Sequence, residues 1–217
     1  MNIEQARFNM IEQQIRTWDV LDQDVLNLLM IVKRENFVPA AYTALAFVDT
    51  EIPLPCGQSM LQPKLEARML QEAAVKKHEH VLEIGSGSGY MAALLGRCAR
   101  QVTSVEIEPA LQVLARNNLA QSGIDNVTIE AGDGAHGWPA QAPYDVIMIS
   151  ASLPTIPAEF FEQIKVGGRI LAIVGEAPVM TAQCITRVST LGFTTVNLFE
   201  TAIKPLQNAI TPSHFKF

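Results

Sequence analysis

Three acidic residues, Glu83, Glu106 and Asp133, lie at the carboxyl ends of successive apolar segments of the chain. Glu83 belongs to the segment Val81–Gly89, whose sequence VLEIGSGSG ends with a glycine at every second position. Glycine lets a backbone turn sharply and approach a ligand closely, because no Cβ stands in the way. Carboxylates attract an ammonium group and accept hydrogen bonds from hydroxyl groups such as those of ribose. These residue types therefore favour a site for a nucleoside that also carries a positive charge.

The spacing of the glycines separates two classes of nucleotide cofactor. A dinucleotide site has the pattern G-x-G-x-x-G and holds a pyrophosphate at the start of the following helix. Here Gly85, Gly87 and Gly89 give G-x-G-x-G, and Glu83 just before the turn would repel a pyrophosphate. Glu83 would instead attract the ammonium of S-adenosylmethionine (AdoMet), which carries no phosphate. The pattern favours AdoMet over NAD, and glycines that serve packing alone are the alternative.

The order of apolar segments predicts how these acids come together. Strands are expected at 81–84, 101–106, 127–131, 144–150, 169–174, 182–188 and 193–199, and helices at 2–16, 22–33, 64–74, 90–97 and 109–121. Alternating strands and helices predict a doubly wound α/β fold, in which parallel strands end at one common edge. Glu106 lies 17 residues after Gly89, close to where such folds place the carboxylate that binds ribose hydroxyls. The N-terminal helices and a proline-rich irregular loop at 48–63 are expected to cover this edge.

Length and composition bound the class of protein. At 217 residues the chain suits a single domain, 1–217, with 1–79 holding the N-terminal helices and active-site loop and 80–217 the sheet. A net charge of -6 argues against a dedicated nucleic-acid binder. Neither a signal peptide nor a membrane-spanning apolar run is visible, so a cytoplasmic location without membrane attachment is expected. The three cysteines and four histidines show no metal-ligand spacing, so no metal is predicted, and the oligomeric state stays open.

A wider set of motifs resembles one family over nearly the whole chain, the protein-L-isoaspartate O-methyltransferases. The most particular segment is Gly57–Pro63, GQSMLQP, which is similar to the family's G-Q-T-I-S-x-P segment. The other matching stretches are Phe37–Pro39, Ala67–Met69, Val81–Tyr90, Val105–Glu106, Asn126–Val127, Gly132–Gly134, Ala142–Asp145, Ile156–Pro157, Gly167–Gly168, Val174–Gly175 and Lys204–Leu206. The resemblance implies a Rossmann-like AdoMet-dependent methyltransferase fold, with a mostly parallel seven-stranded sheet, helices on both faces and an N-terminal helical cover.

The resemblance also implies an activity in protein repair. Such enzymes transfer a methyl group from AdoMet to the stray carboxylate of isoaspartyl residues, and the ester collapses to a succinimide that can reopen to aspartate. The expected partners are therefore isoaspartyl-containing peptides or proteins. Because the acceptor carboxylate is already ionised near neutral pH, the enzyme mainly has to align it with the methyl group. This chemistry requires neither a catalytic triad nor a metal.

One residue departs from the family pattern. In the family, the serine of G-Q-T-I-S-x-P is treated as the active-site residue, and Leu61 stands at that position here. Leucine neither donates nor accepts a hydrogen bond. Ser59 stands two residues earlier, and in an extended segment that spacing returns a side chain to the same face. Ser59 is therefore the candidate catalytic residue, and the alternative is that Leu61 lines an apolar pocket for a different acceptor.

The resemblance assigns further residues to the cofactor. For the methionine part they are Glu83, Gly85, Gly87 and Ser88, and for the sulfonium side Gln58, Ser59, Met60 and Leu61. For the ribose and adenine they are Glu106, Ile107, Asp133 and Gly134, with Gln207 near the C-terminal end of the site. The pairs Ser150–Ala151 and Val174–Gly175 are candidate walls of the substrate site, with ordinary packing as their alternative.

Three hypotheses remain open on the sequence alone. The first is methyl transfer to isoaspartyl residues, and the second keeps AdoMet but changes the acceptor to a small molecule or another protein group. The third is a protein that binds AdoMet or its product without turnover. The orientation of Gln58–Pro63 towards the transferable methyl group distinguishes the three. The sequence leaves open whether Ile210–Phe217 folds over the site.

Overall fold

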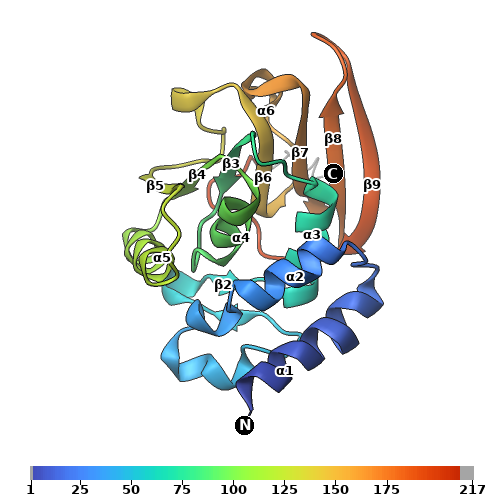
Figure 1. Cartoon of the computed structure of the whole chain (residues 1–217). Helices are drawn as coiled ribbons and strands as arrows, with labels where there is room; N and C mark the ends of the chain where they lie inside the picture. The colour runs from blue at the N-terminus through green and yellow to red at the C-terminus, as the bar shows by residue number, and fades with distance from the viewer. Residues whose placement is uncertain (1, 211–217) are drawn as a thin grey trace, which may run out of the picture.

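A central sheet organises the computed structural model, which describes residues 2–210 (Figure 1). Seven strands lie in the order β5-β4-β3-β6-β7-β8-β9. Their bounds are β3 (His80–Ile84), β4 (Gln101–Glu106), β5 (Val127–Ala131), β6 (Tyr144–Leu153), β7 (Ile164–Glu176), β8 (Val179–Arg187) and β9 (Phe193–Thr201). The pairs from β5 to β7 are parallel, and β8 and β9 are antiparallel. The predicted mostly parallel seven-stranded sheet is confirmed, whereas the question about Ile210–Phe217 falls almost wholly outside the described residues.

Helices cover both faces of this sheet, because strand side chains alternate between the two faces. The bounds are α1 (Ile3–Met10), α2 (Gln23–Ile31), α3 (Pro63–Ala73), α4 (Tyr90–Cys98), α5 (Pro109–Gln121) and α6 (Ala158–Gln163). Val81 and Val146 belong to one buried cluster, with residues of α2 to α5. Leu82 and Ile147, their neighbours in the strands, belong to a second cluster that includes Phe160 of α6. The short helix α6 was not predicted from the sequence.

The first helix, predicted at 2–16, is helical throughout residues 3–18 but changes its type along the way. Helix α1 ends at Met10, and a π-helical turn over Ile11–Ile15 and a 3-10 turn over Arg16–Trp18 follow it. The Thr17 hydroxyl donates to the two carbonyl oxygens that lie three and four residues before it, at 3.0 and 3.1 Å. Such side-chain bonds compete with the regular backbone ladder of a helix. The wider turn keeps both isoleucines at its ends buried.

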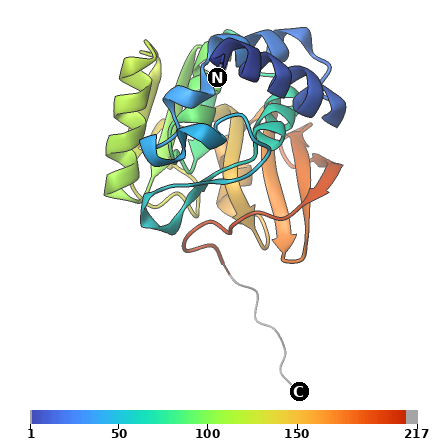
Figure 2. The same ribbon diagram turned by 90° about the horizontal axis from the view of Figure 1, so that it is seen from below.

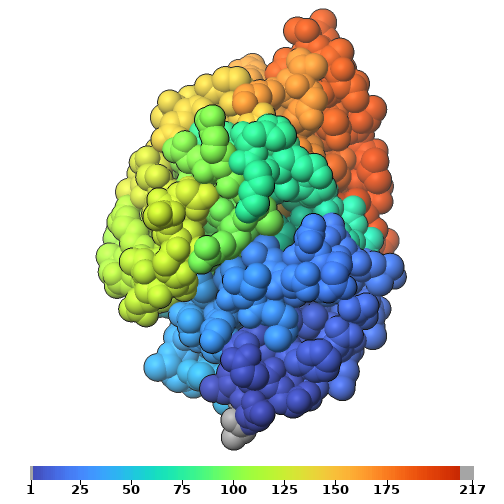
Figure 3. Space-filling view, in the orientation of Figure 1, coloured from blue at the N-terminus to red at the C-terminus, as the bar shows by residue number. Residues whose placement is uncertain are grey.

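Buried ion pairs hold the N-terminal segment together and join it to α3. Figure 3 shows this segment in blue, packed below the green and orange parts of the chain. The Arg7 side chain is 1% exposed and pairs with Glu35. The Arg34 side chain is 0% exposed and pairs with Glu66 on α3. Breaking a buried pair leaves an uncompensated charge, so these contacts hold the cover in one position.

The proline-rich stretch expected to be an irregular loop contains a small hairpin. Strands β1 (Ile52–Pro53) and β2 (Ser59–Met60) pair in antiparallel register. Between them, the backbone N–H of Leu54 donates to the Gln58 carbonyl at 2.8 Å, which closes a tight turn. The hairpin matters for function because it presents Gln58–Leu61 to the carboxyl ends of the sheet strands.

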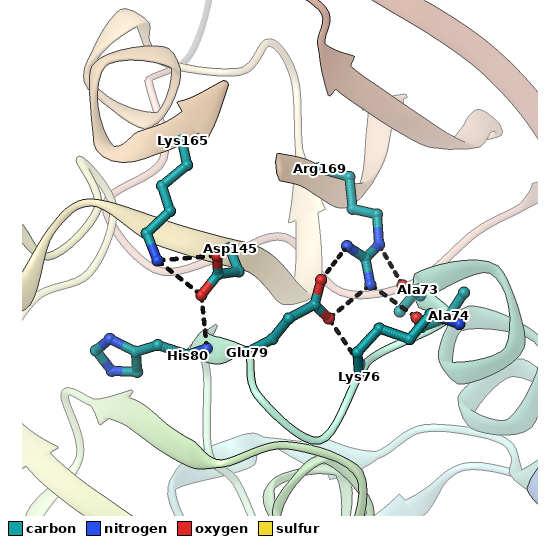
Figure 4. A network of polar contacts seen from close by, with 8 residues as sticks. All are labelled: Ala73, Ala74, Lys76, Glu79, His80, Asp145, Lys165 and Arg169. Atoms are coloured by element: carbon teal, nitrogen blue, oxygen red, sulfur yellow. Dashed lines mark hydrogen bonds and ion pairs between the residues drawn. The ribbon is translucent and has the colours of Figure 1, made fainter. Parts of the chain in front are cut away.

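The opposite, amino-terminal edge of the sheet is held by a separate polar network (Figure 4). Arg169 donates to both carboxylate oxygens of Glu79 at 2.9 Å. The same guanidinium donates to the carbonyls of Ala73 and Ala74, which have no partner within α3 because they lie at its C-terminal end. Beside it, Asp145 accepts hydrogen bonds from a lysine ammonium on β7 and from the first backbone N–H of β3. These contacts are structural and lie away from the strand ends that carry the acids.

Candidate functional site

The glycine-rich turn links β3 to α4 and is fixed by contacts to neighbouring elements. Its Gly87 backbone N–H donates to Glu106 Oε2 at 2.9 Å. Gly89 has φ +84°, and a Cβ there would lie 3.2 Å from the Ala115 backbone on α5. A larger residue at Gly89 would therefore push α5 away from the turn. The alternating glycines thus serve close packing as well as access to the backbone.

Two of the predicted acids lie at the carboxyl ends of adjacent parallel strands. Glu106 ends β4, and its Oε1 accepts the backbone N–H of Glu108 at 3.0 Å. Asp133 follows β5, with Oδ1 accepting the backbone N–H of Ala135 at 2.9 Å and Oδ2 accepting the Asn208 amide at 2.8 Å. A carboxylate oxygen offers two lone pairs, so each group keeps acceptor capacity for a ligand. The pairing of β4 with β5 brings the two acids to the same edge.

These acids line an open cavity, which we call the outer cavity. Nine of the residues predicted to bind the cofactor contribute to it: Gln58, Ser59, Gly85, Gly87, Glu106, Ile107, Asp133, Gly134 and Gln207. The two candidate substrate-wall residues in the last part of β6, Ser150 and Ala151, line it as well. Val174 and Gly175 line neither this cavity nor the one beside it.

A second, smaller space adjoins the outer cavity, and we call it the inner cavity. The two share Ser59, Gly85, Gly87 and Ser150 as lining residues. The inner cavity is lined by Leu54, Ser59, Met60, Leu61, Glu66, Glu83, Gly85, Ser86, Gly87, Ser88, Tyr90, Met91 and Ser150. Every residue predicted to bind the cofactor therefore lies on one of the two adjoining cavities, whereas the candidate substrate-wall pair Val174–Gly175 does not.

Glu83 is fully buried at the boundary of the inner cavity. It accepts hydrogen bonds from the Ser104 hydroxyl at 2.5 Å and the Ser150 hydroxyl at 3.1 Å. Burial raises the pKa of Glu83 to about 8, and the two serine hydroxyls oppose that rise only in part. No cationic side chain is among the groups that influence this pKa. Glu83 is thus a buried acid whose pKa burial holds well above its ordinary range.

Ser59 and Leu61 occupy different positions in the hairpin. The Ser59 hydroxyl lies where the two cavities meet and donates to Glu51 Oε2 at 2.7 Å. The Leu61 side chain is partly buried against the core and lines only the inner cavity. Its carbonyl oxygen accepts from Arg34 at 2.7 Å. Ser59 is the hydroxyl of this segment that reaches the space common to both cavities.

The sequence analysis did not assign several lining residues to the site, among them Glu66, Tyr90 and Glu108. Tyr90 directly follows the glycine-rich turn, so its place in the motif was the signal that could have identified it. Glu108 lies two residues after the predicted ribose carboxylate, which was a similar signal. Glu66 gave no local signal, because its burial depends on Arg34, 32 residues earlier in the chain.

A segment near the C-terminal end closes one side of the outer cavity (Figure 2). The Lys204 ammonium donates to the Gly57 carbonyl at 2.7 Å, and the Gln207 amide donates to Glu108 at 3.0 Å. The Asn208 amide donates to Asp133, the acid that follows β5. We call residues 203–209 the C-terminal strap. It joins the hairpin to the ends of β4 and β5 across the cavity mouth.

Two structural features are absent from the part of the chain that the structure describes. Within residues 2–210, no helix combines the length and apolar character required to cross a bilayer. Over the same residues, no cluster of three or more His, Cys, Asp or Glu side chains has the arrangement of a metal site.

Comparison with known proteins identifies the family. Residues 5–201 match the family model for protein-L-isoaspartate(D-aspartate) O-methyltransferase. A Brucella anthropi protein-L-isoaspartate O-methyltransferase is 38% identical over 206 residues, with 94% of each chain covered. Its counterpart from Koribacter versatilis is 41% identical over 181 residues, covering 83% of this chain and 81% of the relative.

Solved structures agree with this match in fold. A protein-L-isoaspartate O-methyltransferase superposes with a TM-score of 0.79 at 26% identity, over 92% of this chain and 65% of that one. A Plasmodium falciparum protein described as belonging to the same enzyme class was solved with S-adenosyl-L-homocysteine (AdoHcy). It superposes with a TM-score of 0.78 at 19% identity, over 93% of this chain and 98% of that one. The resemblance seen in the motifs is thereby confirmed. This chain belongs to the protein-L-isoaspartate(D-aspartate) O-methyltransferase family.

Proposed function

We propose that this protein transfers a methyl group from AdoMet to the carboxylate of isoaspartyl residues in damaged peptides and proteins. Membership of an AdoMet-dependent methyltransferase family supports both the cofactor and the enzyme class. The observation that carries the proposal is the meeting of two cavities at Ser59. One cavity has acids suited to a nucleoside, and the other has a buried acid suited to an ammonium.

The lining residues fit AdoMet in size and chemistry. Glu106 keeps a free lone pair on each oxygen and would accept from the two ribose hydroxyls. Asp133 would accept from the adenine amino group, and Ile107 would pack against the ring. Glu83 would pair with the ammonium of the methionine part. A Cβ at Gly134 would lie 2.9 Å from the Ile84 side chain, so glycine keeps the adenine side of the cavity open.

In this account the protein orients two reactants. When bound, AdoMet supplies a methyl group attached to a positively charged sulfur. Ser59, at the space shared by both cavities, would turn from Glu51 to hydrogen-bond the acceptor carboxylate. Gln58, Met60 and Leu61 would enclose the sulfonium side and exclude water. Orientation of this kind can lower a barrier by up to ~7–11 kcal/mol.

A second candidate keeps the cofactor and changes the acceptor. The observation that favours it is the apolar side of the inner cavity, where Leu61 lies with Leu54, Met60 and Met91. An apolar wall at the family's serine position offers no hydrogen bond to a carboxylate. A third candidate is a protein that holds AdoMet or AdoHcy without turnover.

The proposal extends to the setting of the enzyme. We propose a single methyltransferase domain, 1–217, that acts in the cytoplasm on isoaspartyl-containing peptides or proteins. Its three described cysteines are free thiols, in line with a reducing compartment. Its net charge of -6 supports a partner other than nucleic acid.

The test is methyl transfer from labelled AdoMet to an isoaspartyl peptide, beside its aspartyl twin and a control without peptide. AdoMet binding is measured by calorimetry on the same sample. Turnover of only the isoaspartyl peptide is expected, and Ser59→Ala should then lower kcat while AdoMet still binds. Tight AdoMet binding without turnover of either peptide would exclude the leading proposal in favour of the other two.

A further inference from the structure

The closed end of the inner cavity lies against the first turn of α4. Ser88, Tyr90 and Met91 line it there. The N-cap residue Gly89 provides no side-chain hydrogen bond to the free N–H groups of this turn. A helix N-terminus carries partial positive charge and unpaired donors, which favour a carboxylate.

The Tyr90 hydroxyl supplies a second, independent sign of a ligand. Tyr90 is 2% exposed, and its Oη has no hydrogen-bond partner among the described residues. A buried hydroxyl without a partner has lost its hydrogen bonds to water and has formed no protein hydrogen bond to replace them. Burial also raises the pKa of Tyr90, so the group remains a hydroxyl donor across the physiological range.

Neighbouring side chains pack around the Tyr90 ring but do not form a hydrogen bond with its hydroxyl. The Phe37 ring lies 5.3 Å away, centroid to centroid. The Arg34 guanidinium lies 5.1 Å from the Tyr90 ring centroid, and that guanidinium pairs with Glu66. Arg34 donates hydrogen bonds to Glu66 and to the Leu61 carbonyl, and it does not line the inner cavity. Tyr90 lines the inner cavity, and its hydroxyl is a buried donor of this cluster without a hydrogen-bond partner among the described residues.

We propose that the Tyr90 hydroxyl donates a hydrogen bond to the α-carboxylate of the cofactor's amino-acid end, beside the first turn of α4. Tyr90 is thus a positioning residue that selects ligands with an intact amino-acid tail. The inference rests on the proposed function, since it takes AdoMet or AdoHcy as the ligand.

The order of the cavities supports this assignment over contact with the methyl acceptor. A ligand with its nucleoside in the outer cavity passes the shared residues Ser59, Gly85, Gly87 and Ser150 before it enters the inner one. The sulfur and the acceptor then lie at the shared part, and the amino-acid tail lies beyond it. There Glu83 faces the ammonium, while Tyr90 and the start of α4 face the carboxylate.

The experiment compares two ligands that differ in the tail alone. AdoHcy carries the amino-acid tail, and 5′-methylthioadenosine keeps the nucleoside and sulfur without it. Calorimetry with the full chain measures both affinities for the native protein and for Tyr90→Phe. The matched control is Tyr144→Phe, because Tyr144 is 0% exposed, lines neither cavity and donates to the Trp138 carbonyl at 2.6 Å.

Tyr90→Phe should weaken AdoHcy binding about tenfold or more and leave methylthioadenosine binding within about twofold. Its melting temperature without ligand should equal or exceed that of the native protein, whereas Tyr144→Phe should melt lower and bind both ligands normally. Equal AdoHcy affinity in Tyr90→Phe, or an equal loss for both ligands, would overturn the inference and leave the proposed function standing. A native protein that binds neither ligand would overturn both.

Discussion

Glu106 is the acid whose geometry is best defined, because two backbone N–H groups orient its two oxygens. In Glu106→Gln one oxygen is replaced by an amide that cannot accept from ribose or from Gly87. We expect AdoHcy affinity to fall by about tenfold or more, the usual scale for hydrogen bonds to a charged group. The measurement is calorimetry, with Glu130→Gln on the neighbouring strand as control. Unchanged affinity in Glu106→Gln would remove Glu106 from the ribose site.

Glu83 gives a pH-dependent prediction for the protein without ligand. Its pKa is about 8 in the folded state, above the ordinary value of 4.5, because burial disfavours the charged form. Between these two values the folded chain holds a proton that the unfolded chain has released, so the free energy of unfolding falls as pH rises. The stability linked to Glu83 is complete below about pH 4.5 and is lost as pH rises through about 8.

Glu83→Gln removes this titration and keeps a side chain of similar shape. We expect the variant to gain stability relative to the native protein as pH rises from about 5 to about 8. Urea denaturation of both proteins across that range measures the difference. A difference that stays constant with pH would show that Glu83 is ionised in the empty protein.

At the scale of elements, Arg169 joins the C-terminal end of α3 to the amino-terminal edge of the sheet. Arg169→Ala leaves Glu79, whose side chain is 10% exposed, without its cation. We expect a loss of about 2–4 kcal/mol in the free energy of unfolding, near the range for broken buried pairs. The control Lys165→Ala breaks a pair whose lysine is 42% exposed and should cost less than about 1 kcal/mol. Equal losses in the two variants would contradict this account.

The elements differ in how well the sequence predicts them. All seven strands of the large sheet and helix α5 were predicted, because each is an apolar run or an amphipathic repeat bounded by turn residues. Helix α6 was missed, since its six residues are too few to show a helical period. The first helix was predicted at about the right place, but its change from α-helical to π-helical and 3-10 turns after Met10 was not, because apolar periodicity does not reveal helix type.

At the scale of the whole molecule, the C-terminal strap lies along one side of the outer cavity. Lys204→Met keeps the aliphatic stem and removes the ammonium that reaches the Gly57 carbonyl. We expect AdoHcy to dissociate about 2–10-fold faster with little change in association rate, because one hydrogen bond of the closed state is lost. A stopped-flow chase measures the rate, with Lys33→Met as control. An unchanged dissociation rate would mean that the strap does not retain the ligand.

Long-range contacts also explain what the sequence could not predict about the site. Glu83, Glu106 and Asp133 were predicted from strand ends, which is a local pattern. The strap contact spans 147 residues, and the Arg34 contact spans 32 residues. Neither follows from a motif, because each depends on how distant segments pack.

The most direct test of the account follows the acceptor itself. An isoaspartyl peptide is incubated with the protein and AdoMet, and chromatography resolves the isoaspartyl, succinimide and aspartyl forms over time. The account predicts that the isoaspartyl form is converted through the succinimide to the aspartyl form, only when AdoMet is present. An isoaspartyl peptide that stays unchanged while AdoMet is bound would contradict the central claim that this site methylates damaged aspartyl residues.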